Sequence, residues 1–237
     1  VDGWVETGTE VTSHYDPMLA KLIAHGADRA DALNRLAAAV AQTRMGGIET
    51  NLAWLGTVLA DTRVRQGAVA TTLLKDLAWR PATVEVVLPG AQTSLQDWPG
   101  RLGYWDVGVP PSGPFDDRSF RLANRIVGNG EGASALECTL TGPTLRFNTD
   151  AVVALTGAEM AATLDGQPVP WWQPVTIRAG QVLALGSITG PGQRSYLAVR
   201  GGFDAPDYLG SKATFALGRF GGHGVGVLKP GDTLHLA

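Results

Sequence analysis

The stretch GVPPSGPFDDRSFRLANRIVGN, residues 108–129, passes without a spacer from a rigid loop into an amphipathic helix. Proline fixes φ and glycine permits positive φ, so this loop is expected to keep one shape. Asp116 or Asp117 should cap the helix, which should end at Gly128. Its apolar face should carry Phe120, Ala123 and Val127. A stiff loop with small polar groups at the mouth of a helix suits a binding site or a tight corner.

Short apolar runs separated by turn residues lie on both sides of this helix in the sequence. Dipeptides such as Asp165-Gly166 and Ala179-Gly180 are typical turns between strands. The spacing favours a barrel or sandwich over alternating strands and helices. We therefore expect a mainly β barrel with one attached helix. The expected strands are 83–88, 144–147, 151–156, 161–164, 174–177, 181–186, 195–200 and 232–236.

The composition changes near residue 80. Of the 31 glycines, 7 lie in the first 80 residues and 24 follow, whereas the first 80 residues hold 14 alanines. We expect two domains, an α+β domain over 1–80 and the β domain over 81–237. The elements expected in the first are a strand over 15–26, a helix from its cap Asp28 to Gly46 or Gly47, a second helix over 50–61 capped by Thr50, and a short third helix over 71–77.

The charge of the chain limits the classes of partner that it is expected to bind, and its cysteine content indicates the cellular compartment. The 19 basic and 22 acidic residues give a net charge of −3 without long runs of one sign, so neither nucleic acid nor an anionic membrane is favoured as a partner. The single cysteine, Cys138, excludes an internal disulfide framework and fits a reducing compartment, the cytoplasm. No apolar run is long enough to span a membrane. Because the chain starts with Val1 in what reads as a β region, we expect it to be a fragment.

Candidate site residues lie in glycine-punctuated loops beside strand ends, where a rigid scaffold commonly carries binding groups. Asp97 and Arg101 are open to two interpretations: they pair with each other and pin a turn, or they serve a site. Glu137 lies between apolar residues. It is either a buried, hydrogen-bonded carboxylate or a strand residue that faces water.

Two further polar residues have weaker signals. Ser112 has no histidine beside it and no G-x-S-x-G elbow, so a serine nucleophile has little support. His223 is flanked by glycines, which suit either a close approach to a ligand or an irregular corner of a barrel. No metal site is expected, because the spacing that metal ligands need is absent among His14, His25, His223 and His235.

Longer stretches resemble two known families. Residues 15–55, YDPMLAKLIAHGADRADALNRLAAAVAQTRMGGIETNLAWL, resemble the C-terminal end of biotin carboxylase domains, where a Y-D-x-M-x-x-K-L-I strand precedes an amphipathic helix and a G-x-x-T-N turn. From residue 84 on, GVPPSGPFDDRSFRLANRIVGN, ALECTLTGPTLRF and GSKATFALGRFGGHG are similar to the allophanate hydrolase subunit 2 family, which includes the Kip-type kinase antagonist and a 5-oxoprolinase subunit. These families occur fused in this order in urea carboxylases.

This resemblance implies a reaction with cofactors and partners. ATP and bicarbonate, with Mg²⁺, would carboxylate biotin, and the carboxyl group would pass from a biotin carrier domain to urea to give allophanate. The ATP, Mg²⁺, bicarbonate and carrier sites would lie outside these 237 residues, so the fragment alone should be inactive. The expected partners are urea, the carboxybiotin carrier and the rest of the same multidomain enzyme, and a homo-oligomer is a further expectation.

The resemblance also implies a fold and site residues. Residues 81–237 would form a cyclophilin-like barrel, the first part of a carboxyltransferase domain. Catalytic roles fall to Asp97, Arg101 and Glu137. Substrate-binding positions are Tyr104, Ser112, Gly113, Asp116 and His223. The rigid loop would present backbone amides and the helix N-terminus to a carboxylate-bearing ligand.

Three points qualify these roles. Asp16 and Lys21 match the strand that borders the biotin carboxylase site, so they receive a supporting role. An arginine expected near Val225 and Gly226 is absent, which puts an anion-binding role for the stretch around His223 in doubt. Two alternatives stay open: a guanidine carboxylase of the same architecture, and a non-catalytic Kip-type module that binds a protein.

Overall fold

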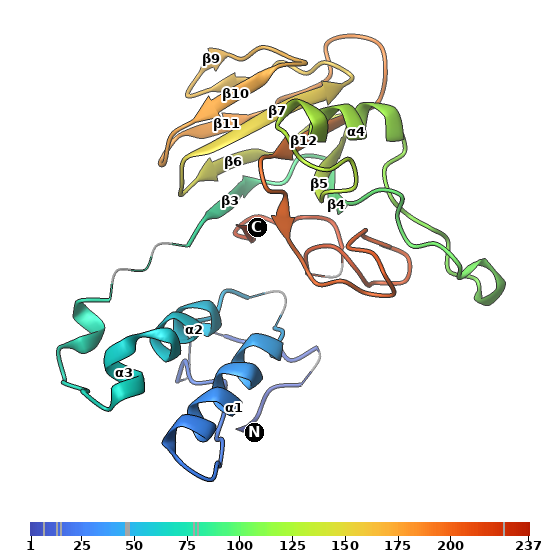
Figure 1. The fold of residues 1–237 in the computed structure, drawn as a ribbon. Helices are drawn as coiled ribbons and strands as arrows, with labels where there is room; N and C mark the ends of the chain where they lie inside the picture. The colour runs from blue at the N-terminus through green and yellow to red at the C-terminus, as the bar shows by residue number, and fades with distance from the viewer. Residues whose placement is uncertain are drawn as a thin grey trace. The chain divides into compact units, whose positions relative to one another are not determined.

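The computed structural model describes residues 1–237 apart from Thr7, Ser13, Tyr15, Gly46, Gly47, Ala78, Arg80 and Val225. The chain divides into two compact units, which Figure 1 colours along the sequence. The first comprises Val1–Met45 and Thr50–Arg80, and the second comprises Gly46–Glu49 and Pro81–Ala237. Over the residues described, no helix has both the length and the apolar character that crossing a membrane requires.

Helices dominate the first unit, in which α1 packs against α2. Asp28 caps α1 as predicted, since its Oδ1 accepts the Asp31 N–H at 2.8 Å. Val40, Leu59 and Leu73 are buried. In chain order, the elements are β1 (Asp2–Gly3), β2 (Ala20–Lys21), α1 (Arg29–Gln42), α2 (Leu52–Ala60), α3 (Thr62–Gln66) and the 3-10 helix η1 (Leu73–Lys75).

Several local predictions for this unit were wrong. Only β2 forms within the strand predicted over 15–26, because a turn in which Asp16 Oδ1 accepts the Met18 N–H at 2.8 Å precedes it. Asn51, and not Thr50, precedes the first residue of α2. The helix predicted over 71–77 shrinks to η1, whereas α3, capped by Asp61, was not predicted. The predicted helix end at Gly46 or Gly47 lies outside the described residues, and α1 ends at Gln42.

The second unit is mainly β, as predicted, and contains two antiparallel sheets. The five-stranded sheet has the order β10 (Pro174–Ile177), β7 (Ala151–Gly157), β12 (Arg194–Val199), β5 (Ala135–Thr139) and β4 (Gln92–Gln96). The seven-stranded sheet has the order β13 (Phe203–Asp204), β14 (Thr233–Leu236), β3 (Thr83–Leu88), β6 (Thr144–Phe147), β11 (Val182–Ala184), β8 (Thr163–Leu164) and β9 (Gln167–Pro168).

The two sheets bury one apolar core between them. Alternate residues of each strand point inward, such as Val84 and Val86 of β3 and Leu136 and Cys138 of β5. Among the described strands each sheet keeps two edges, so the predicted closed barrel is not formed. The sheets are joined on one side by the isolated bridges Thr141–Ser187 and Met160–Ile188.

Helix α4 (Asp117–Ile126) covers the outer face of the five-stranded sheet, over β7, β12 and β5 (Figure 1). Its predicted face is confirmed, since Phe120, Ala123 and Val127 are buried there. Phe120 meets the ring of Tyr196 edge-on at 5.8 Å between centroids. Gly128 follows the helix at φ 84°. The facing positions on the sheet include Ala135, Ala154 and Ala198, whose small side chains let the helix approach closely.

Cys138 lies fully buried in this core, and burial raises the pKa of its thiol to about 12. The unfolded thiol loses its proton above about pH 8.5, whereas the folded thiol keeps it up to about pH 12. The unfolded state then binds fewer protons, so stability must fall as pH rises through this window, by about 1.4 kcal/mol per pH unit.

We expect denaturant unfolding between pH 8 and 10.5 to show this loss. Cys138→Ala is the control, since it costs a roughly constant free energy for the lost sulfur and removes the titration. The difference between the two proteins should therefore depend on pH. Equal pH slopes for both proteins would contradict the assignment.

Candidate functional site

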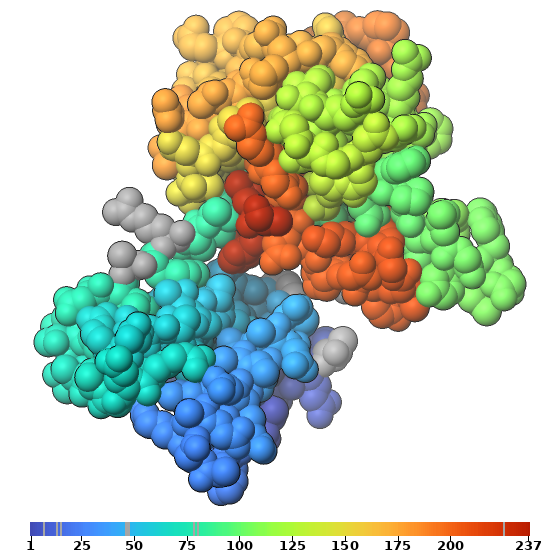
Figure 2. Space-filling view, in the orientation of Figure 1, coloured from blue at the N-terminus to red at the C-terminus, as the bar shows by residue number. Residues whose placement is uncertain are grey.

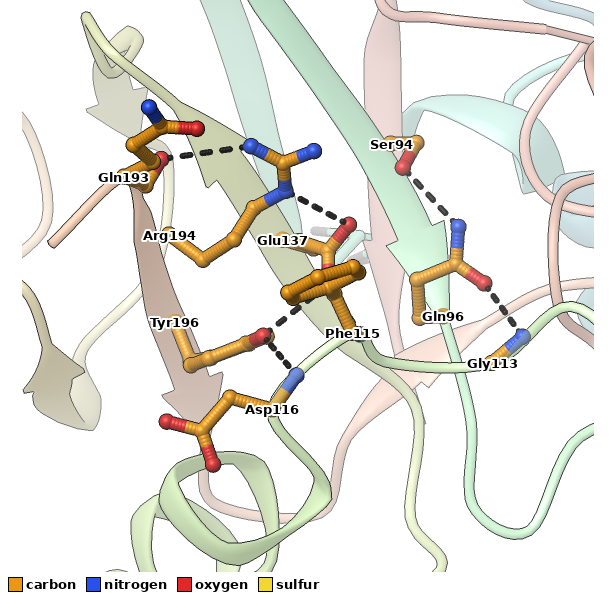
Figure 3. A network of polar contacts seen from close by, with 9 residues as sticks. All are labelled: Ser94, Gln96, Gly113, Phe115, Asp116, Glu137, Gln193, Arg194 and Tyr196. Carbon is orange, nitrogen blue, oxygen red and sulfur yellow. Dashed lines mark hydrogen bonds and ion pairs between the residues drawn. The ribbon is translucent and has the colours of Figure 1, made fainter.

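The rigid loop, residues 108–116, is tied to the outer face of the five-stranded sheet by side chains from three neighbouring strands (Figure 3). Gln96 of β4 accepts the Gly113 N–H with its Oε1 at 3.1 Å. Its Nε2 donates to Ser94 Oγ at 2.9 Å, which fixes the orientation of the amide. Glu137 of β5 accepts the Phe115 N–H at 2.7 Å with Oε2.

Tyr196 of β12 completes this attachment. Its hydroxyl accepts the Asp116 N–H at 2.7 Å and donates to Glu137 Oε2 at 3.0 Å. Burial and the neighbouring carboxylate raise the pKa of Tyr196, so the hydroxyl stays protonated and keeps donating. Ser94, Glu137 and Tyr196 are direct partners in the strand register, and therefore project from one face of the sheet. Of the two interpretations of Glu137, the structure shows the buried, hydrogen-bonded carboxylate.

Asp97 and Arg101 do not pair with each other. Both instead hold the segment 208–213, more than a hundred residues away in the sequence. Asp97 accepts the Ser211 hydroxyl at 2.6 Å and the Lys212 N–H at 2.7 Å. The expectation of an Asp97–Arg101 pair is therefore wrong, because each group finds partners in this distant segment.

Arg101 is fully buried. Its guanidinium donates to the carbonyl oxygens of Tyr208 at 2.8 Å, Ala213 at 3.0 Å and Ser211 at 3.3 Å. Its carbon Cζ lies 4.9 Å from the centre of the Phe220 ring. Within the described part of the chain these partners are neutral, and no carboxylate pairs with the charge. Buried charges usually have such a partner.

Three buried side-chain atoms have no hydrogen-bond partner among the residues described, and all belong to segments around the rigid loop. They are Arg101 Nη1, Ser112 Oγ and Arg194 Nε. The Arg101 N–H donates to Pro111 O at 2.6 Å, which joins the first two segments. Ser112 has φ 58°, a conformation that L residues rarely adopt outside constrained sites. Buried polar atoms are normally satisfied, so this cluster is a candidate ligand contact.

Some predicted binding groups are already used within the protein. The Gly113 N–H is bound to Gln96, so the expectation of a free amide there is wrong. Asp116 caps α4, with its carboxylate accepting the Ser119 N–H at 3.0 Å and the Ser119 hydroxyl at 2.5 Å. The helix N-terminus is therefore partly satisfied by its own cap.

Of the remaining predicted residues, Tyr104 contacts the loop through its backbone, where its carbonyl oxygen accepts the Val109 N–H at 3.0 Å. Tyr104 precedes the 3-10 helix η2 (Trp105–Val107), in a green segment that projects from the surface in Figure 2. His223 lies 3.9 Å from Asp232, and burial lowers its pKa, so it is neutral at physiological pH. The predicted departure at Val225 falls outside the described residues.

Asp16 and Lys21 lie in the first unit and are described separately. Asp16 binds its own turn, and Lys21 Nζ lies 3.6 Å from Asp2 in an exposed pair. Among the residues described, no three His, Cys, Asp or Glu side chains are grouped to hold a metal ion.

Four contributors to this region were not predicted: Gln96, Phe115, Arg194 and Tyr196. Tyr196 carried a usable signal, because a tyrosine in an otherwise apolar strand needs a partner for its hydroxyl. Arg194 stands two positions before Tyr196 and so shares its face of the sheet. Nothing in the sequence indicated the other two.

Two known families match the chain. The biotin carboxylase C-terminal domain matches residues 1–76. The carboxyltransferase domain, subdomain A and B, matches residues 107–237.

Named relatives extend these matches. The urea amidolyase of Saccharomyces cerevisiae is 48% identical over 236 residues, which cover 100% of this chain and 13% of that protein. A 5-oxoprolinase subunit of Escherichia coli is 40% identical over 151 residues, 64% of this chain and 48% of that protein. The crystal structure of the Kluyveromyces lactis urea carboxylase matches with a TM-score of 0.84 at 46% identity, over 99% of this chain and 21% of that one. The chain thus spans a small part of the length of its full-length relatives.

Proposed function

This chain belongs to the carboxyltransferase family of subdomains A and B, and from that premise we propose that it works as part of a biotin-dependent, ATP-using urea carboxylase. The proposed reaction moves a carboxyl group from carboxylated biotin to a urea nitrogen and yields allophanate. One observation carries the proposal. A biotin carboxylase C-terminal domain and a carboxyltransferase domain follow each other in a chain that is similar over its whole length to a urea amidolyase.

The proposed division of labour follows the two units. Residues 1–80 would be the C-terminal part of a biotin carboxylase domain, and residues 81–237 the first part of the carboxyltransferase. The two sheets would be the halves of a flattened cyclophilin-like barrel, which their shared core supports. Asp16 and Lys21 would support the biotin carboxylase site. We propose that the enzyme works in the cytoplasm, in keeping with Cys138, the single cysteine of these 237 residues, which is free.

Cofactors and partners follow from the reaction. Biotin on a carrier domain would deliver the carboxyl group, and ATP, Mg²⁺ and bicarbonate would be bound at sites outside these 237 residues. The other partners would be urea and the remaining domains of the same enzyme, with self-association left to measurement.

Within the second unit, Arg101 is proposed to stabilise negative charge that develops on an oxygen during transfer. Its Nη1 is buried and has no partner in the described part of the chain, so both of its N–H groups remain for a ligand. A fixed donor in a site without water stabilises such charge more than a donor in water. Asp97 would shape the same corner by holding Ser211 and Lys212. Ser112 Oγ is the second donor proposed to face the substrate.

Glu137 is proposed to act on substrate through one oxygen only. Its Oε2 is occupied by Phe115 and Tyr196, whereas Oε1 has no hydrogen bond from the residues described. Tyr104 and His223 are proposed as outer groups of the binding region. Gly113 and Asp116 would position the loop without touching substrate, since their polar groups are occupied.

The test uses the biotinylated enzyme that contains this chain, with ATP, Mg²⁺ and labelled bicarbonate. We expect label to enter an acid-labile product when urea is added, and guanidinium to be a poor acceptor. Faster labelling with guanidinium would replace urea by guanidine. Absence of both covalent biotin and acceptor-dependent labelling would overturn the proposal in favour of a protein-binding module.

A further inference from the structure

An acceptor and a donor, each without a hydrogen bond among the residues described, lie side by side on the outer face of the five-stranded sheet. They are Glu137 Oε1 and Arg194 Nε, 3.6 Å apart. We propose that this pair binds the edge of a planar urea group, N–H to Oε1 and C=O to Nε, beneath the ring of Phe115. The inference rests on the proposed function and names the ligand chemistry of that site. Urea and the ureido ring of biotin share this edge.

The carboxylate is held with one oxygen free. Oε2 accepts the Phe115 N–H and the Tyr196 hydroxyl, which fixes the plane of the carboxylate. The separation of 3.6 Å between Oε1 and Arg194 Nε is too long for a hydrogen bond. Oε1 therefore keeps its capacity to accept from a ligand.

The guanidinium of Arg194 also has unfilled hydrogen-bonding capacity. Its Nε is buried without a partner among the residues described, and its Nη1 reaches only the carbonyl of the preceding Gln193, at 3.4 Å. Leaving a buried charged donor unbonded costs free energy, so the pair is incomplete as it stands. A ligand carbonyl at Nε would remove that cost.

Phe115 covers this pair. Figure 3 shows its ring in front of Glu137, and Arg194 Cζ lies 5.3 Å from the ring centre. The ring is nevertheless exposed, since 82% of the residue is accessible to water. Its backbone N–H is fixed by Glu137, so rotation about χ1 can uncover the pair while the loop stays in place. A flat ligand would then stack against the ring.

Charge favours a neutral amide over a cation. Glu137 and Arg194 together are neutral, so a neutral urea edge adds no unbalanced charge. A guanidinium ligand would bring a second positive charge beside Arg194. It also offers no acceptor for the Nε–H of Arg194. The pair would thus select urea by leaving the wrong ligand unpaired.

The probe is 2-imidazolidone, a cyclic urea whose CH₂ protons report binding in ligand-observed NMR. With the wild-type enzyme, without ATP and bicarbonate, we expect saturable binding. Arg194→Lys keeps the charge but loses Nε, and should weaken binding about tenfold, as expected for one charge-assisted hydrogen bond. The matched control is Arg146→Lys, which alters another cross-strand pair, with Glu85 at 3.0 Å, and should leave binding unchanged.

Competition against the bound probe distinguishes urea from the ureido ring of biotin as the natural ligand of the pair. Displacement of the probe by urea, but not by biotin methyl ester, assigns the pair to urea, and the reverse assigns it to the biotin ring. Displacement by neither ligand would overturn the inference. Equal affinities in wild-type and Arg194→Lys enzyme would overturn it as well.

A crystal structure of the wild-type enzyme with 2-imidazolidone keeps the test decisive if Arg194→Lys does not fold. The ring should lie between Oε1 and Nε, and a ring bound elsewhere would refute the assignment. Failure of the proposed function and failure of this binding subsite give different results. An enzyme that binds the probe here but transfers no carboxyl group to urea would leave the subsite intact, whereas normal transfer with unchanged binding in the variant would refute the subsite alone.

Discussion

Replacing Arg101 by methionine is expected to lower urea-dependent carboxyl transfer by about 100- to 1000-fold, the usual cost of removing a buried donor to a developing oxyanion. Biotin carboxylation driven by ATP should stay close to the wild-type rate, because it is proposed to occur in another domain. The variant should also lower the free energy of unfolding of the second unit by about 1–3 kcal/mol, the usual cost of leaving buried acceptors without a donor. It leaves the carbonyls of Tyr208, Ser211 and Ala213 without their charged donor.

Separate assays of the two half-reactions check this result. The control is Arg178→Met, which removes an exposed guanidinium paired with Asp150 and should alter neither rate by more than about twofold. Arg101→Lys keeps the charge and part of the donor set, so it should restore some of the transfer rate. Equal losses in both half-reactions would make Arg101 a purely structural residue.

Much of the second unit could be predicted because its signals are local. The rigid loop, the cap Asp116 and the buried face of α4 depend on residues within a few positions of one another. Each of the eight predicted strands overlaps an observed strand, although the one over 161–164 shrinks to Thr163–Leu164. Strands β4, β5, β9 and β13 were missed. The first, QTSLQ, is mostly polar in sequence, yet four of its five residues are buried.

The site was predictable only where its signals are local in the sequence. Asp97, Arg101 and Glu137 were singled out from their surroundings, but their partners were not, since those come from distant segments. Asp97 binds Ser211, 114 residues away. Glu137 binds Tyr196, 59 residues away. Such pairings are set by the register of β5 against β12 and by the path of the loop after β13, which no local pattern encodes.

A barrel was predicted from the sequence, but its closure depends on contacts that no local pattern encodes. The number and spacing of strands are properties of the sequence, whereas closure depends on the pairing of edge strands. The edge strands of the seven-stranded sheet are short: β13 and β9 have two residues each. Strands of that length offer few hydrogen bonds for closing a sheet.

The glycine stretch beside His223, which was considered for ligand contact, has a packing role. Replacing Gly221 in this stretch is therefore expected to have a large effect on stability and on carboxyl transfer. Gly221 has φ 70°, and a methyl group there would overlap the Ala213 carbonyl oxygen and meet Arg101 Nη2 at 2.8 Å. Gly221→Ala therefore combines an unfavourable backbone conformation with a collision against the buried guanidinium. We expect it to lower the free energy of unfolding by about 3 kcal/mol and to lower carboxyl transfer by displacing Arg101.

Denaturant unfolding of five proteins separates these contributions: wild type, Gly221→Ala, Gly231→Ala, Arg101→Met and the double variant. Gly231→Ala is the matched control, because φ is 85° there but a methyl group would meet no atom within 4 Å, so about 1 kcal/mol of conformational cost should remain. In an Arg101→Met background one of the two collisions is relieved, and the cost of Gly221→Ala should fall by about 1 kcal/mol. Strict additivity of the two changes would show that Gly221 does not act on Arg101, and its glycine would then be required by backbone conformation and the Ala213 carbonyl alone.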